Sequence, residues 1–159
     1  MKRTDGIKLI LSLALCAGAG VIGSQYTVSA IPVWYAGLVK PWFTPPAWLF
    51  GPVWTALYLL MGVALYSVWI KGSKKKEKGE AIQLFFIQLI FNAAWSLIFF
   101  GLHNIFAALV EIVILWLLIT ETTLAFYKID RSAGKLLLPY LIWVSFAAVL
   151  NFAIWQMNF

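Results

Sequence analysis

The chain has 159 residues, of which 63% are hydrophobic and only 11% are charged, with a mean hydropathy of +0.89. A soluble domain carries about 25% charged residues, so this chain lacks the polar surface to cover a water-facing globule. These figures exclude a soluble enzyme or carrier and predict one integral membrane domain over residues 1–159.

Two further classes are excluded by single residue types. Cys16 is the one cysteine and His103 the one histidine, so no disulfide framework is possible and we expect no metal site. The net charge of +6 lies in short basic stretches between apolar runs. No basic stripe lies beside exposed aromatic residues, which excludes nucleic acid and favours contact with anionic membrane lipid.

Five apolar segments follow one another along the chain, at about 7–26, 47–70, 81–101, 105–127 and 136–157. Each approaches the ~20 residues that a helix needs to cross a bilayer. Backbone groups in lipid must be satisfied within the segment, which favours helices. The sequence therefore predicts an all-α bundle of five transmembrane helices. The predicted connections are a long loop over 27–46, a charged turn over 71–80, a tight reversal at 102–104 and a short basic turn over 128–135.

The first segment also has features of a signal peptide, with a basic start and small residues at 17–19. The apolar run continues to Tyr26, long enough to span, and Leu15 occupies the position where a lipoprotein signal needs a small residue before Cys16. We therefore expect a retained helix. Small residues such as Ala14, Gly18 and Gly23 permit close helix approach, either within the bundle or in a homodimer.

The basic residues divide unequally between the two sides of the predicted bundle. Eleven belong to the N-terminal tail and the second and fourth connections, whereas Lys40 alone belongs to the other side. The eleven are Lys2, Arg3, Lys8, Lys71, Lys74, Lys75, Lys76, Lys78, Lys128, Arg131 and Lys135. Positively charged loops stay in the cytoplasm, which predicts a cytoplasmic N-terminus with the C-terminus and the long first loop outside.

Three predicted helices each carry aromatic and amide residues on one face at helical spacing. These faces comprise Trp54, Tyr58, Met61 and Leu65; Gln88, Asn92, Trp95 and Phe99; and Trp143, Ala147, Leu150 and Asn151. Ordinary interhelical packing is one interpretation. However, the amides and Glu111 lie at lipid depth, where polar groups face the bundle interior or a wet cavity. We interpret these faces as the walls of a small-molecule cavity. Glu121 is closer to the basic side, within reach of Lys128 or the interface.

The first loop is rich in proline and tryptophan. Pro41, Pro45 and Pro46 are expected to keep the chain out of helix until the second span, while Pro52 falls in its first turns. Trp34, Tyr35, Trp42 and Trp48 have rings that can be buried over the cavity with their polar edges near water. We therefore predict that this loop is a lid.

Several separated motifs, in order along the whole chain, resemble the TspO/MBR family. They are WYAGLVKPWFTPP at 34–46, GPVW at 51–54, FNAAW at 91–95 and PYLIW at 139–143, continued by residues 146–151. This family comprises bacterial tryptophan-rich sensory proteins and the mitochondrial translocator protein, also called the peripheral benzodiazepine receptor. The resemblance implies a bacterial member in the cell membrane, often dimeric, with a cavity beneath the first loop that binds porphyrins and isoquinoline or benzodiazepine ligands.

The resemblance also assigns residues to the site. The positions that match the family motifs are Trp34, Tyr35, Pro45, Pro46, Trp54, Asn92, Trp95, Trp143 and Ala147. Tyr58, Phe99, Leu150 and Asn151 join this candidate site from the helix faces. Some family members bind cholesterol through a segment with Leu, Tyr and Arg. Here the corresponding residues are Leu150, Phe152 and Gln156, which argues against a cholesterol role.

The leading functional hypothesis is a membrane receptor or transport protein for tetrapyrroles such as protoporphyrin IX or haem, with a sensory role. Trp54, Trp95 and Trp143 would form aromatic walls, and Lys40 is the cation nearest to the propionates. No cofactor is required, with porphyrin bound as a ligand. An alternative is light-dependent porphyrin degradation, in which Trp54 and Trp143 act as redox partners. A third hypothesis is a regulatory scaffold that docks a partner on the loop at 71–80.

Overall fold

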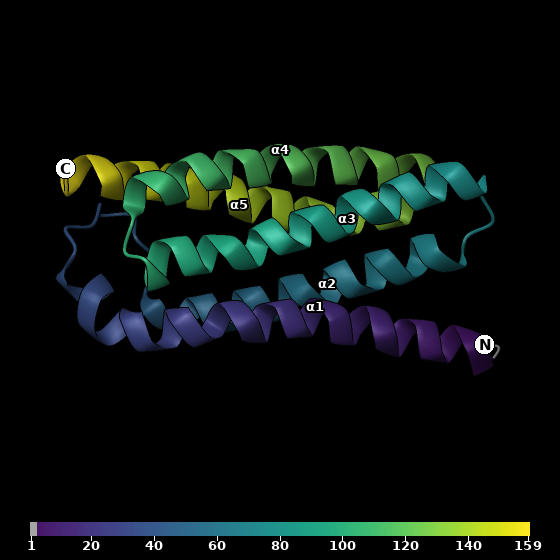
Figure 1. Ribbon diagram of the computed structural model, residues 1–159, viewed down its shortest axis with the longest axis horizontal. Helices are drawn as coiled ribbons and strands as arrows, with labels where there is room; N and C mark the ends of the chain where they lie inside the picture. Colours follow the sequence, from purple (N-terminus) through teal and green to yellow (C-terminus); the bar gives the residue numbers. More distant parts are fainter. Residues whose placement is uncertain (1–2) are drawn as a thin grey trace.

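The computed structural model describes residues 3–159, with side chains from Asp5 onward. Five long helices form an antiparallel bundle that places the two ends of the chain at opposite ends of the molecule (Figure 1). The helices are α1 (Arg3–Ala30), α2 (Phe50–Ile70), α3 (Lys75–Ser96), α4 (Ile105–Ile129) and α5 (Arg131–Met157). All five are long and apolar enough to cross a membrane, which confirms the predicted five-helix fold.

Three short segments of other helical types border the long helices. A π-helix, η1 (Ile31–Tyr35), continues α1, and a second, η3 (Leu97–Gly101), continues α3. A 3₁₀-helix, η2 (Ala47–Leu49), leads into α2. The predicted effect of the prolines is confirmed, because Pro41, Pro45 and Pro46 lie outside helix and Pro52 is the third residue of α2.

The predicted loop over 27–46 is wrong in its first half. Helical backbone continues through Gly37, so the loop comprises only residues 38–46. The hydroxyls of Ser24, Thr27 and Ser29 donate to carbonyl oxygens of the preceding turn at 2.9, 3.1 and 3.2 Å. Because such bonds satisfy polar side chains within a helix, this polar stretch does not end α1. Trp34 and Tyr35 consequently lie on η1 and not on a free loop.

The two connections with many charges are also shorter than predicted. Helix α3 begins at Lys75, and a single residue, Asp130, separates α4 from α5. Asp130 caps α5, since its Oδ1 accepts from the Ser132 N–H at 2.9 Å and its Oδ2 pairs with Lys71 Nζ at 3.2 Å. The backbone N–H of Ser132, with a smaller contribution from the Lys71 ammonium, lowers the pKa of Asp130.

The tight reversal predicted at 102–104 is confirmed. The Leu102 N–H closes η3 by donating to the Leu97 carbonyl at 2.8 Å, and Asn104 caps α4 by accepting from the Ala107 N–H at 2.9 Å. His103 between them has a φ of 54°. A non-glycine residue adopts this left-handed conformation uncommonly, although His does so more often than most.

Two glycines let neighbouring helices approach closely. Helix α1 packs on α2 and α4 packs on α5, while α3 contacts both α1 and α4. A Cβ at Gly20 would lie 2.6 Å from the Tyr58 ring, and one at Gly134 would lie 2.6 Å from the Tyr127 side chain. Gly18 has open space around it, so a Cβ there would meet no neighbouring helix among the described residues.

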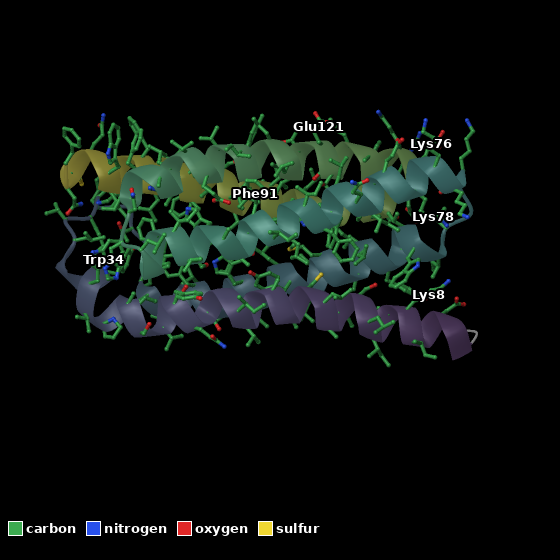
Figure 2. The ribbon with its side chains drawn as sticks, in the orientation of Figure 1. Lys8, Trp34, Lys76, Lys78, Phe91 and Glu121 are labelled. Atoms are coloured by element: carbon green, nitrogen blue, oxygen red, sulfur yellow. The ribbon has the colours of Figure 1, made fainter. Side chains whose placement is uncertain are left out.

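Charged and aromatic residues gather at opposite ends of the bundle. Lys8, Lys76 and Lys78 lie at the end that holds the N-terminus, whereas Trp34 lies at the other (Figure 2). We call the latter, which also holds loop 38–46, turn 102–104 and the C-terminus, the lid end. Glu121 is exposed and points away from the bundle (Figure 2). Lys2 falls outside the described residues.

Candidate ligand-binding site

A polar network joins three helices in the middle of the bundle. The Tyr58 hydroxyl donates to Asn92 Oδ1 at 2.5 Å, Asn92 Nδ2 donates to the Tyr140 hydroxyl at 3.0 Å, and that hydroxyl donates to Gln88 Oε1 at 2.9 Å. Gln88, Asn92 and Tyr140 are all buried. Hydrogen bonds are stronger in the low-dielectric interior of a protein than in water, and a satisfied network there makes the interior rigid. The network therefore holds α2, α3 and α5 in one register.

Trp54 lies against this network. Its ring stacks on Tyr58 with centroids 5.6 Å apart and meets the edge of Tyr140 at 6.2 Å. The structure thus brings together three predicted site residues, Trp54, Tyr58 and Asn92. Tyr140, the central residue of this network, was not among the predicted site residues. It precedes Trp143 by three positions and shares its helix face, so its spacing was an available signal.

A second group surrounds a small cavity of about 30 Å³ at the lid end. Six predicted site residues line it: Tyr35, Trp95, Phe99, Ala147, Leu150 and Asn151. Trp95 stacks on Phe99 at 5.0 Å, and its indole N–H donates to Asn151 Oδ1 at 3.2 Å. Phe50, Phe100 and Ile154 complete the lining and were not predicted. A volume of this size is close to that of one water molecule.

The wall of this cavity includes an unused polar group. Tyr35 is 7% exposed, and its hydroxyl has no hydrogen-bond partner among the described residues. Buried hydroxyls nearly always have one. Glu111 does not line this cavity but is also buried, at 7% exposed, and neither of its carboxyl oxygens has a hydrogen-bond partner among the described residues. The expectation that Glu111 faces the bundle interior is therefore confirmed.

Loop 38–46 is held over the lid end by two side chains. Asn158 Oδ1 accepts from the Val39 N–H at 3.0 Å, while Asn158 Nδ2 donates to the Val39 carbonyl at 2.8 Å. Lys40 Nζ donates to the carbonyls of Tyr35, Ala36 and Leu38 at 2.8, 3.2 and 2.7 Å. The Lys40 ammonium therefore caps the extended α1 segment in this conformation. Asn158 was missed, since no local pattern marks a contact 119 residues away.

The aromatic residues of the loop differ in their roles. Phe43 packs edge-on to Phe146 at 6.3 Å, and Phe146 in turn lies 5.7 Å from Trp143. Trp42 is 95% exposed and Trp48 is 72% exposed, so the prediction that both rings are buried over the cavity is wrong. Their position at the end of a spanning bundle is typical of residues at the membrane interface.

Three further predicted site residues belong neither to the lining of the 30 Å³ cavity nor to the polar network. Trp143 contacts Phe50, with centroids 6.2 Å apart, on the loop side of α5. Trp34 stacks on His103 at 4.4 Å and meets the edge of Phe99 at 5.3 Å. Pro45 is partly buried in loop 38–46. The predicted set is therefore distributed over the polar network, the cavity and the loop around it.

Fold and site together define a polytopic α-helical membrane protein with an aromatic interior beneath a clamped loop. Residues 12–156 match the TspO/MBR family. Tryptophan-rich protein TspO of Chlorobaculum tepidum is 49% identical over 155 residues, 95% of this chain and 98% of the relative. Tryptophan-rich sensory protein of Cereibacter sphaeroides is 36% identical, covering 97% and 93%, and human translocator protein is 39% identical, covering 86% and 82%. The chain belongs to the TspO/MBR family.

Proposed function

We propose that this protein is a membrane receptor that binds tetrapyrroles such as protoporphyrin IX, and isoquinoline or benzodiazepine-type ligands, in the interior beneath loop 38–46. The observation that carries this proposal is the aromatic cavity between η1, η3 and the helices α2, α3 and α5. Tyr35 lines this cavity, and its hydroxyl has no hydrogen-bond partner in the part of the chain that the structure describes. Flat aromatic ligands pack well on indole and phenyl rings. A hydroxyl without a partner supplies one polar contact for orientation.

Binding of such a ligand requires the site to expand. Small-molecule sites measure about 300–1,000 Å³, whereas the cavity measures about 30 Å³. Loop 38–46 is the element that can move, because it is non-helical and is attached through Asn158 and the Phe43–Phe146 contact. The proposed mechanism is that the loop opens, the ligand enters between η1 and α5, and the position of the loop reports occupancy.

The proposed orientation follows from the basic residues. Lys8, Lys76 and Lys78 lie at one end of the bundle (Figure 2), which supports a cytoplasmic N-terminus and a lid end outside the bacterial cell membrane. A homodimer is a further part of this proposal, and Gly18, with open space around it, gives a partner helix close access.

Titration with protoporphyrin IX in the dark, followed by tryptophan fluorescence, tests the proposal. We expect quenching with micromolar affinity, about −8 kcal/mol, and weaker binding for Trp54→Phe, Trp143→Phe and Tyr35→Phe. Trp48→Phe is the matched control, because Trp48 is 72% exposed. Equal affinity for all four variants would mean that the ligand binds elsewhere.

Light-dependent porphyrin degradation is a second candidate, and one contact favours it. Trp54 stacks on Tyr58 and meets the edge of Tyr140, an array of rings that can each donate an electron to a photoexcited porphyrin. Illumination should then yield a new absorbing product that Trp54→Phe fails to form. The same yield from free tryptophan would reduce the reaction to nonspecific photochemistry.

A further inference from the structure

A groove of about 410 Å³ lies at the lid end, lined by the last turns of α1, by η1 and by the η3–α4 turn. Its floor is formed by Ala30 and Phe100, which are 7% and 8% exposed. Its rim is open, since Ser29, Gly101 and His103 are exposed and Val33 is 76% exposed. Among the described residues, Phe100 alone lines both the groove and the 30 Å³ cavity, so the two are largely separate.

Both sides of this groove have π-helical backbone, which indicates that the groove is a functional site. Both π-helices contribute to it, η1 through Val33 and Trp34 and η3 through Phe100 and Gly101. π-Helical segments are rare and occur frequently at functional sites. His103, with its φ of 54°, holds its ring 4.4 Å from that of Trp34 at an interplanar angle of 15°.

The close approach of the two walls depends on a glycine. A Cβ at Gly101 would lie 3.0 Å from Cδ1 of Tyr26, so the Tyr26 ring rests against the η3 backbone. Tyr26, Ala30 and Val33 follow one another along α1 and η1 at helical spacing and form an apolar strip of about 10 Å. The strip leads from the interior of the span toward turn 102–104, where helices end and polar headgroups begin.

The chemistry of the lining indicates the occupant. The groove opens on the periphery of a spanning bundle, where the surrounding molecules are lipids. Among the described residues its lining contains no acidic side chain, and the ring N–H groups of Trp34 and His103 lie together at the end near turn 102–104. The Ser29 hydroxyl already donates to the carbonyls of Gln25 and Tyr26. Donors at one end and an apolar strip at the other complement a molecule with a phosphate and an acyl chain.

We propose that this groove binds one diacyl phospholipid, with an acyl chain along Tyr26, Ala30 and Val33 and the phosphodiester at Trp34 and His103. This lipid site is separate from the proposed tetrapyrrole site. The lipid would pack against the outer side of η1, whose Trp34 touches Phe99 of the cavity wall.

Native mass spectrometry of delipidated protein titrated with phosphatidylglycerol tests the proposal. We expect the first lipid to bind roughly tenfold more tightly than later ones. Val33→Trp fills the groove and should abolish this first site. Val28→Trp, an equally large change at a position that is 70% exposed and outside the groove, should retain it. Protoporphyrin affinity in Val33→Trp stays within about twofold of wild type if the two sites are separate.

A second variant tests the headgroup contact. His103→Gly removes the ring and suits the left-handed backbone, so the fold is retained. Wild type should prefer phosphatidylglycerol to diacylglycerol, and His103→Gly should lose that preference. Retention of the first lipid by Val33→Trp would overturn the proposal. Conversion of a dimer to a monomer by Val33→Trp without loss of lipid would overturn it too, and would assign the groove to a second copy of the chain.

Discussion

The Asn158 side chain makes both backbone hydrogen bonds of Val39, at 3.0 and 2.8 Å, across 119 residues of sequence. Its amide also donates to the Ile154 carbonyl at 2.7 Å, which fixes the side chain on the end of α5. Loop 38–46 is thereby attached to the last helix at a single backbone position. This contact makes the C-terminal end of α5 a part of the proposed site.

Asn158→Ala is expected to loosen loop 38–46 without unfolding the bundle. The loss of two bonds to Val39 removes about 1–3 kcal/mol of local stability, so hydrogen exchange at residues 38–46 should accelerate at least tenfold. Porphyrin association and dissociation should both become faster. Gln156→Ala, a change at an exposed residue two positions earlier on α5, is the control. Unchanged exchange in Asn158→Ala would show that other contacts hold the loop.

Ala147→Thr is expected to weaken ligand binding. Ala147 lines the 30 Å³ cavity, and threonine adds a β-branch and a hydroxyl that can bond to the carbonyl four residues earlier and bend α5. We expect a several-fold loss of porphyrin affinity while the bundle remains folded. Ala148→Thr, at a partly buried neighbour outside the cavity lining, provides the comparison. A lower melting temperature with unchanged affinity would mean that Ala147 serves only helix packing.

Tyr140→Phe is expected to be one of the most destabilising conservative changes. It removes the hydroxyl that bonds both Asn92 and Gln88, and each buried group left unpaired costs about 1–3 kcal/mol. Thermal melts in detergent should show a drop of several degrees. Tyr127→Phe, at a tyrosine that is 44% exposed, should leave the melting temperature unchanged. Equal melts for the two variants would contradict the structural role of the network.

The spans were predictable from sequence because lipid depth imposes a length on apolar runs, and five runs met it. The helical extension through residue 37 was not, because Thr27 and Ser29 look like loop residues until their bonds to the preceding turn are known. Helix faces indicated Trp95, Ala147 and Asn151 correctly as neighbours in the interior. The contact of Asn158 with Val39 depends on the meeting of two distant ends, which no local pattern records.

Asp130 makes the free energy of unfolding depend on pH, through its cap at the end of the bundle near the N-terminus. Its pKa is lowered in the fold from 3.8, chiefly by the Ser132 N–H, so its contribution is complete above pH 3.8 and is lost as the pH falls through the lower folded value. Asp130→Ala should cost about 1 kcal/mol near neutral pH, and this difference should become smaller in strong acid, where the protonated carboxyl keeps an acceptor but loses its charge. Asp130→Asn retains a cap and should cost less. A loss that is the same in acid would contradict the charged cap.

The central claim is that ligand enters the interior by displacement of loop 38–46, and a disulfide across the Val39–Asn158 contact tests it most directly. Val39→Cys with Asn158→Cys places one thiol on each of the two segments that this contact joins, and the native Cys16 is buried. The extent of oxidation is measured by thiol labelling, and protoporphyrin IX is then titrated before and after reduction. We predict that the oxidised protein fails to bind at concentrations that saturate the reduced form, and that reduction restores micromolar affinity, about −8 kcal/mol. Full affinity in fully oxidised protein would contradict entry beneath the loop.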